Sequence, residues 1–227
     1  MPTVILLRHG RSTANNAGVL AGRSQDVELD GSGRAQAEKV IARLDGVPLA
    51  AIVSSPMTRC QQTVAPLAVA RELTPRTEPD LAEVDYGSWT GAELKTLATE
   101  PLWRVVQAHP SAAVFPGGEG LAGMQARAVA AVRRHDAAVA AEHGPHAVWL
   151  ACSHGDLIKS ILADALAVHL DNFQRILVDT CSMSVVTYTE TRPFVVRVND
   201  VAGDVAGLIP PKKPDGNGSD AVVGGTT

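Results

Sequence analysis

Cysteine and aromatic residues are scarce in this sequence. Aromatic residues make up 4% of its 227 residues, and its three cysteines are Cys60, Cys152 and Cys181. An odd number of cysteines with no CxxC spacing fits neither a disulfide framework nor a structural zinc site. The seven histidines include no HExxH motif, which is a common zinc-binding arrangement. We therefore expect reduced, buried thiols and no bound metal.

A strong charge of one sign and a long apolar run are also missing. The formal net charge is −4, so no global basic field would hold a nucleic acid or an anionic membrane. No stretch reaches the roughly 18 apolar residues of a membrane span. The first residues, MPTVILLRHG, lack the basic region and cleavage site of a signal peptide. We expect a soluble, cytoplasmic protein with no nucleic-acid or membrane partner.

The remaining composition is that of an ordinary globular protein. Hydrophobic residues make up 45% of the chain and charged residues 19%, which suits one sizeable core. We expect one domain over residues 1–202. Residues 203–227 are rich in Gly, Pro and Asp, and they hold too few large apolar groups to offset their ordering entropy, so a disordered tail is expected. Self-association through an edge strand or a helix face is left open.

Strand and helix patterns alternate along the chain. Short β-branched runs predict strands at Thr3–Leu7, Ala50–Ser54, Ala147–Cys152, Met183–Thr189 and Phe194–Asn199. Apolar residues at helical spacing predict helices from Asp30 to a stop at Gly46, from Met57 to Arg71, from Leu121 to His143 and over Leu157–Ala167. Residues 80–120 have weaker patterns, and we interpret them as an irregular segment outside the sheet that carries function. The order predicts an α/β fold, a three-layer α/β/α sandwich with a mostly parallel central sheet.

Two histidines directly follow predicted strands. His9 lies in Arg8–His9–Gly10 and His154 in Ser153–His154–Gly155. Ligands of open α/β sheets bind at the carboxyl ends of the strands, so both histidines are expected at one site. Taken alone, each would more often be a structural histidine, and the case for function depends on the residues around them.

A third strand end adds a second arginine. The segment VSSPMTRCQQT places Arg59 in the first turn of a helix, where its charge opposes the helix dipole unless an anion lies in front of it. The planar guanidinium group matches phosphate oxygens. Arg8, Arg59 and His154 around His9 would therefore form a small cationic phosphate pocket in an acidic protein.

Seven motifs occur in order over roughly residues 3–190. They are RHGRSTAN, GRSQDVELDGSGRAQA, SSPMTRCQQT, LAEVDYGSWTG, PGGEG, CSHGD and the strand near Thr180–Met183. A lone RHG would be weak, but the ordered series resembles the histidine phosphatase superfamily, which includes cofactor-dependent phosphoglycerate mutases and small-molecule phosphatases. The resemblance implies a phosphoglycerate mutase-like fold and a small phosphorylated substrate, and it requires no metal or other cofactor.

The resemblance also implies a role for each site residue. His9, as neutral imidazole, attacks phosphorus and becomes a phosphohistidine. Arg8, Arg59 and His154 hold the phosphoryl oxygens. Glu83 gives a proton to the leaving alkoxide and later activates water. For this work Glu83 must be protonated in the substrate complex, which requires a pKa raised by burial or by the nearby phosphate.

Other polar residues near these motifs are assigned less directly. Ser12 and Asn15 could add neutral donors to the phosphate. Asp85 and Asp156 are alternative proton donors, and Glu83 is placed ahead of them by the resemblance. Glu119 of PGGEG is expected to cap the helix that begins near residue 121. Trp89 and Trp103 are expected to be packing anchors, and solvated or structural roles are expected for His109, His135, His143, His146 and His169.

Two positions depart from the family pattern. Arg11 stands where relatives usually have Glu or Gln, and it fits either a second anionic group on the substrate or a salt bridge elsewhere. Gly120 stands where Ser is common.

The Glu83 segment, EVDYGSWTG, resembles the phosphatase branch, so we expect an acid phosphatase-like phosphomonoesterase. A phosphoglycerate mutase-type phosphomutase is the runner-up, and a non-catalytic phospho-ligand-binding protein is the alternative of another class.

Overall fold

A six-stranded mixed sheet forms the centre of the molecule in the computed structural model, which describes residues 2–203. The strands are β1 (Thr3–Arg8), β2 (Leu49–Ser54), β3 (Arg76–Thr77), β4 (Val148–Ser153), β5 (Met183–Tyr188) and β6 (Pro193–Asp200). Their order is β3-β2-β4-β1-β5-β6. The first four are mutually parallel, β5 pairs antiparallel with β1, and β6 pairs antiparallel with β5. The predicted mostly parallel sheet is confirmed, and the two-residue β3 was too short to be predicted.

Helices surround this sheet and fill the long connections. The α-helices are α1 (Thr13–Ala17), α2 (Gly31–Arg43), α3 (Thr58–Ala70), α4 (Leu94–Leu97), α5 (Pro101–Ala108), α6 (Leu121–His143) and α7 (Gly155–Ala165). Short 3-10 turns are η1 (Pro79–Leu81), η2 (Gly87–Trp89), η3 (Pro110–Ala112) and η4 (Leu170–Arg175). Asp30 caps α2 by accepting a hydrogen bond from the Gly33 amide, as predicted. Helix α7 begins two residues earlier than expected, directly after His154.

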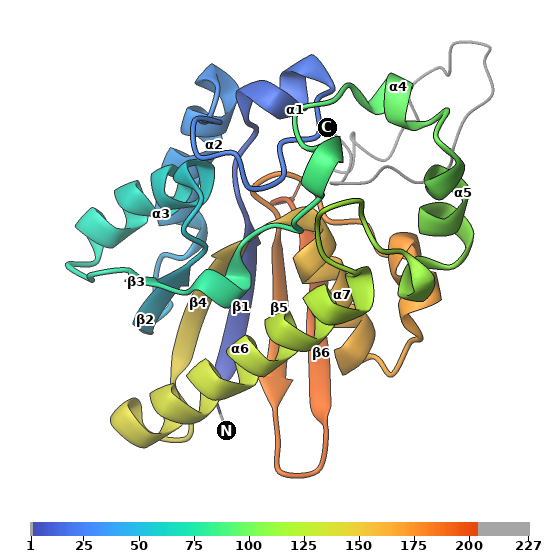
Figure 1. The fold of residues 1–227 in the computed structure, drawn as a ribbon. Helices are drawn as coiled ribbons and strands as arrows, with labels where there is room; N and C mark the ends of the chain where they lie inside the picture. The colour runs from blue at the N-terminus through green and yellow to red at the C-terminus, as the bar shows by residue number, and fades with distance from the viewer. Residues whose placement is uncertain (1, 204–227) are drawn as a thin grey trace.

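Alternate residues of each central strand enter two different cores. In β1, Val4 and Leu6 join the core under α6 and α7, whereas Ile5 and Leu7 join the core under α2 and α3. Because side chains of a strand alternate between faces, a strand buried on both faces is apolar throughout. Figure 1 shows α6 crossing one face of the strands, with α2 and α3 on the other side. The three-layer α/β/α sandwich is confirmed.

The irregular segment predicted between residues 80 and 120 packs through its aromatic side chains. It contains η1, η2, α4, α5 and η3. The rings of Trp89 and Trp103 stack with centroids 6.2 Å apart, and Phe115 lies edge-on to Trp89 at 5.3 Å. Both tryptophans are buried, which confirms them as packing anchors.

Two further expectations concern the chain as a whole. Apart from Gly203, the tail predicted at residues 203–227 lies outside the described residues. Among the helices of residues 2–203, none combines the length and the apolar character needed to cross a membrane.

Candidate active site

The carboxyl ends of β1 and β4 place the two motif histidines side by side. These strands are parallel neighbours with Arg8 opposite Ser153, and His9 and His154 follow them directly. The His9 amide donates to the Ser153 carbonyl at 3.0 Å. The two imidazole rings lie 5.2 Å apart between centroids. The sheet register therefore brings the two histidines together, as the strand-end argument predicts.

Close backbone packing fixes the loop that carries His9. Gly10 donates its amide to Thr63 Oγ1 at 3.0 Å. A Cβ atom on Gly10 would lie 2.7 Å from the Gly33 carbonyl oxygen, and a Cβ atom on Gly33 would lie 2.0 Å from the Arg11 carbonyl oxygen. No side chain fits at either position without moving backbone, so glycine is required where the nucleophile loop meets α2.

The His9 ring is buried and electrically neutral. Its Nδ1 lies 2.8 Å from the Gly10 carbonyl oxygen, so Nδ1 carries the proton and donates it to that carbonyl. Burial lowers the pKa of His9 well below its usual value, and the positive charges of Arg59 and Arg8 lower it further. The Nε2 atom therefore carries a lone pair that is capable of nucleophilic attack at neutral pH.

Two buried guanidinium groups supply the positive charge around His9. Arg8, at the end of β1, donates to the Val178 carbonyl at 2.7 Å. Arg59, in the first turn of α3, donates to the Gly22 carbonyl at 2.8 Å. Burial lowers the pKa of Arg8, and the negative charges of Glu83 and Asp156 oppose that effect. Both guanidinium groups therefore place positive charge beside His9, where it can act on an anion.

His154 is oriented by hydrogen bonds at both of its ring nitrogens. Its Nδ1 lies 3.2 Å from Arg59 Nη2, and its Nε2 lies 2.8 Å from Ser55 Oγ. A guanidinium group can only donate, so Nδ1 accepts and Nε2–H donates to Ser55. Burial first, then Arg59, holds the pKa of His154 well below its usual value. In this structure, the cationic character expected of His154 comes from the two arginines instead.

Glu83 is the carboxyl group that lies against His154. It is buried, and its Oε2 lies 3.7 Å from His154 Nδ1. Burial and then the negative charge of Asp156 raise the pKa of Glu83 to about 7, against the opposing effects of Arg59 and Arg8. Such a carboxyl can hold a proton near neutral pH, as a general acid requires.

The alternative acids occupy different environments. Asp85 is half-exposed and lies 3.7 Å from Arg23 in an ion pair. Asp156 is buried behind the site and accepts a hydrogen bond from Tyr86 at 3.0 Å. Asp85 faces Arg23 and Asp156 faces Tyr86, whereas Glu83 approaches His154, so the geometry favours Glu83.

Ser12 and Asn15 are joined to each other at the start of α1. Ser12 Oγ donates to Asn15 Oδ1 at 2.8 Å, and the Asn15 amide donates to Ser12 Oγ at 3.2 Å. This is a capping box, in which each side chain satisfies backbone groups of the helix end. The Asn15 side-chain amide nitrogen takes no part in the box and remains the donor that this pair could offer to phosphate.

Two arginines that the sequence did not single out hold the Glu83 backbone. Arg23 Nε donates to the Glu83 carbonyl at 2.9 Å, and Arg127 Nη2 donates to the same oxygen at 3.1 Å. Glu119 joins both arginines, at 3.0 Å to Arg23 and 2.6 Å to Arg127. We call Arg23, Glu119 and Arg127 the carbonyl clamp. Arg127 lies within the helical pattern of α6, and that pattern alone does not show which loop it reaches.

The clamp corrects one expectation about Glu119. It was expected to cap α6, but the N-cap residue is Gly120, which has no side chain to do so. The Glu119 carboxylate instead accepts from the Asp85 amide at 2.9 Å and from the two arginines. Charged donors outcompete a cap interaction because charge-assisted hydrogen bonds are the stronger ones.

The structure also shows the partners of Arg11 and His135. Arg11 forms a salt bridge with Asp30 at 2.6 Å, which is one of its two predicted alternatives. His135 Nε2 donates to Glu78 Oε2 at 2.6 Å, in keeping with a structural role. Within residues 2–203, no group of three or more His, Cys, Asp or Glu side chains is placed to hold a metal ion.

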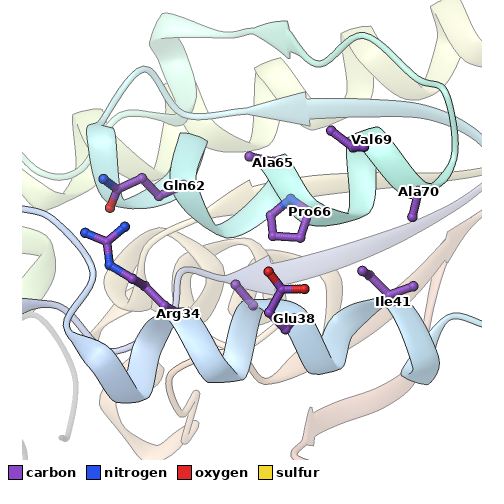
Figure 2. Close-up of a pocket in the computed structure, with 9 residues that line it drawn as sticks. Arg34, Glu38, Ile41, Gln62, Ala65, Pro66, Val69 and Ala70 are labelled. Carbon is purple, nitrogen blue, oxygen red and sulfur yellow. The ribbon is translucent and has the colours of Figure 1, made fainter.

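A surface groove between α2 and α3 is separate from this cluster (Figure 2). Its volume is about 620 Å³, and its lining is mostly apolar. The lining residues are Arg34, Ala37, Glu38, Ile41, Gln62, Ala65, Pro66, Val69 and Ala70. None of them belongs to the His9 cluster, and the groove offers no nucleophile or buried acid. The strand ends are therefore the candidate active site.

The chain is similar to known proteins over most of its length. The Histidine phosphatase superfamily (branch 1) profile matches residues 4–201. Probable phosphoglycerate mutase GpmB of Proteus mirabilis is 31% identical over 213 residues, covering 92% of this chain and 95% of that protein. Phosphoserine phosphatase 1 of Hydrogenobacter thermophilus is 30% identical over 202 residues, covering 88% of this chain and 92% of that protein. The solved structure of Bacillus stearothermophilus YhfR has the same fold, with a TM-score of 0.81 at 24% identity over 89% of this chain and 98% of that one.

Proposed function

Because this chain belongs to the histidine phosphatase superfamily, we propose that it is a phosphomonoesterase that hydrolyses a small phosphorylated metabolite through a phosphohistidine on His9. The observation that carries the proposal is a neutral, buried imidazole beside two guanidinium groups and a carboxyl of raised pKa. That combination supplies a nucleophile, oxyanion stabilisation and a general acid at one place.

The first step transfers the phosphoryl group to His9. The Nε2 lone pair attacks phosphorus, an N–P bond forms and the ester P–O bond breaks. Arg8 and Arg59 stabilise the charge on the non-bridging oxygens, which is the main contribution that a protein makes to phosphoryl transfer. Glu83 delivers its proton to the leaving alkoxide oxygen. The phosphate dianion also favours a proton on His154 Nδ1, which would make that ring a further phosphate ligand.

The second step releases inorganic phosphate. Glu83, now a carboxylate, accepts a proton from water as the water oxygen attacks phosphorus and the N–P bond breaks. The proton returns the carboxyl to its starting form, and His9 leaves as neutral imidazole. Asn15 offers a neutral donor to the phosphate, with Ser12 holding its side chain. No metal or other cofactor enters either step.

The mutase alternative differs only in what accepts the phosphoryl group. The relatives include proteins named for both activities. A mutase must exclude water from the phosphohistidine and grip both phosphates of a bisphosphate. The Glu83 segment of this chain carries Tyr86, Ser88 and Trp89 and no arginine, and Arg11, the extra cation near His9, is engaged by Asp30. These observations favour water as the acceptor.

Turnover of an aryl phosphate tests the proposal. Purified protein is assayed with p-nitrophenyl phosphate and with an alkyl phosphate from acidic to neutral pH, with chelator present, alongside His9→Ala. The exposed His146→Ala is the matched control and should keep parental activity. We expect metal-independent hydrolysis by the parent and its loss in His9→Ala. No turnover by the parent would favour a phospho-ligand-binding protein, and full turnover by His9→Ala would exclude the phosphohistidine.

A second assay separates phosphatase from mutase. The protein is supplied with 3-phosphoglycerate and a catalytic amount of bisphosphoglycerate, and both 2-phosphoglycerate and inorganic phosphate are measured. Phosphate release without isomer formation supports the phosphatase. Isomerisation faster than hydrolysis would make the chain a mutase.

A further inference from the structure

A buried cluster of ionisable side chains lies behind Glu83 and has no part in the steps above. It consists of Tyr86, Asp156 and Lys159, each no more than 4% exposed. Tyr86 Oη donates to Asp156 Oδ2 at 3.0 Å, and Lys159 Nζ lies 3.7 Å from Asp156 Oδ1. Burying two opposite charges costs free energy that their attraction seldom fully repays. We therefore explain the cluster by its effect on neighbouring side chains and not by a contribution to the stability of the fold.

The cluster connects the two sides of the candidate active site. Tyr86 lies three residues after Glu83, in the irregular segment. Asp156 lies two residues after His154, in the first turn of α7. Their hydrogen bond thus ties the segment of the proton donor to the helix whose N-cap is His154. The 3.7 Å approach of Glu83 to His154 is held by this link on one side and by the carbonyl clamp on the other.

On the basis of the proposed function, we propose that Asp156 is a positioning residue for Glu83. Through Tyr86 it holds the carboxyl against His154, and its buried negative charge keeps the proton on Glu83 until the alkoxide leaves. Lys159 limits that charge and holds Asp156 in place. Lys159 is itself fixed by a 2.9 Å hydrogen bond to Gln174 Oε1.

The charges around Glu83 act in opposite directions. After burial, Asp156 contributes most to raising the pKa of Glu83, whereas Arg59 and Arg8 lower it. Burial lowers the pKa of Lys159, against the opposing charges of Asp156 and Glu83, and burial followed by the same two charges raises the pKa of Tyr86. The groups that face Glu83 are Arg8 from β1, Arg59 from α3, Tyr86 from its own segment, and His154, Asp156 and Lys159 at the start of α7.

Three variants separate the positioning effect from the charge effect. Asp156→Asn keeps an oxygen that accepts from Tyr86 but removes the negative charge. Lys159→Met removes the positive charge at a similar side-chain volume. Tyr86→Phe removes the hydrogen bond and changes no charge at neutral pH. The readout is kcat and kcat/KM for an alkyl phosphate against pH, because its leaving group needs the proton of Glu83.

The two charge variants should move the alkaline limb of the pH profile in opposite directions. We expect the apparent pKa of the alkaline limb to fall by about one pH unit in Asp156→Asn and to rise by less in Lys159→Met. In the double variant the limb should return toward its parental position. Tyr86→Phe should lower kcat about tenfold without moving the limb, because the donor is less well placed. The matched control is Asp136→Asn, which alters another buried carboxylate that accepts from an aromatic donor, Trp149, at 2.9 Å; its limb should stay in place.

The outcomes distinguish this proposal from the one on which it rests. If the parent neither turns over nor forms a phosphoenzyme in rapid-quench experiments, the proposed function fails. If the parent turns over but the limbs of Asp156→Asn and Lys159→Met stay fixed or move the same way, only the role of Asp156 is overturned. Thermal unfolding checks each variant, and should Asp156→Asn not fold, the upward shift in Lys159→Met decides.

Discussion

The strand ends and the irregular segment place their functional residues by different means. Arg8, His9 and His154 follow β1 and β4, so the hydrogen-bond register of the sheet fixes where their backbone lies. Glu83 belongs to a segment with no sheet partner, and its position depends on side chains from α6, α7 and the loop after α1. The proposed phosphate-binding half of the site is thus built on backbone geometry, and the proposed proton-donating half on a network of charged and polar side chains.

This difference predicts what should happen when each half is damaged. A strand-end variant should change the chemistry and leave the neighbouring backbone in place. A variant in the network should change the chemistry and the stability of residues 78–120 together, because the same contacts serve both. The following experiments test this comparison.

Removing a strand-end cation should have the largest effect. Arg59→Gln is expected to lower kcat/KM for p-nitrophenyl phosphate about 10³-fold, because a preorganised positive charge at the phosphoryl oxygens is lost. The measurement is steady-state kinetics at pH 6. Arg34→Gln, which breaks only the exposed pair with Glu28, is the control and should be unchanged. A loss below tenfold in Arg59→Gln would contradict the assigned role of this guanidinium.

Removing the proton donor should have an effect that depends on the leaving group. Glu83→Gln is expected to lower kcat by about 10²-fold or more for an alkyl phosphate, and far less for p-nitrophenyl phosphate, whose phenolate leaves without a proton. The pKa of Glu83 is raised to about 7, so the alkyl reaction of the parent should decline as pH rises through 7 and the acid form is lost. Equal losses on both substrates would show that Glu83 is not the acid.

Loosening the carbonyl clamp should affect both activity and stability. Glu119→Gln weakens two guanidinium contacts that lie against the Glu83 carbonyl, and we expect about a tenfold lower kcat on the alkyl phosphate together with a loss of about 1–3 kcal/mol in the free energy of unfolding. Chemical denaturation and kinetics measure the two effects. Glu142→Gln, which breaks the exposed pair with Arg76, should cost less than about 1 kcal/mol. A lower free energy of unfolding with an unchanged kcat would show that the carbonyl clamp does not position Glu83 for catalysis.

The smallest effect is expected at Arg11. Arg11→Gln breaks a partly exposed pair with Asp30, which should cost about 0.5 kcal/mol and leave kcat/KM within about twofold for a monophosphate. The same comparison is then made with a substrate that carries a second anionic group. A loss of kcat/KM confined to that substrate would show that Arg11 contacts its second anionic group.

The sequence predicted most of the fold and the strand-end half of the site. Apolar runs and helical spacing located five of the strands and the four longest helices, since these patterns come from burial on known faces. Arg8, His9, Arg59 and His154 followed because they stand next to those elements in the chain. Glu83 needed the family resemblance, since no periodicity shows where an irregular segment turns its side chains.

What the sequence could not predict depends on tertiary contacts between distant segments. Arg127 reads as one more polar position on a long helix, and Tyr86 as one more aromatic residue to be buried. Glu119 was wrongly placed as a cap because local spacing favours that assignment, whereas the folded chain brings two guanidinium groups to it. The neutrality of His154 results from burial and from Arg59, which are also properties of the fold.

The contact between Gly33 and the Arg11 carbonyl limits which substitutions position 33 can tolerate. Gly33 lies in the first turn of α2, in a motif that carries no proposed catalytic residue, and the sequence alone does not connect it with His9. Yet even the single methyl group of alanine would push against the backbone that follows His9. In a deep mutational scan under selection for catalysis, Gly33 should therefore tolerate as few substitutions as the nucleophile, whereas its neighbour Ser32, which faces outward, should accept many.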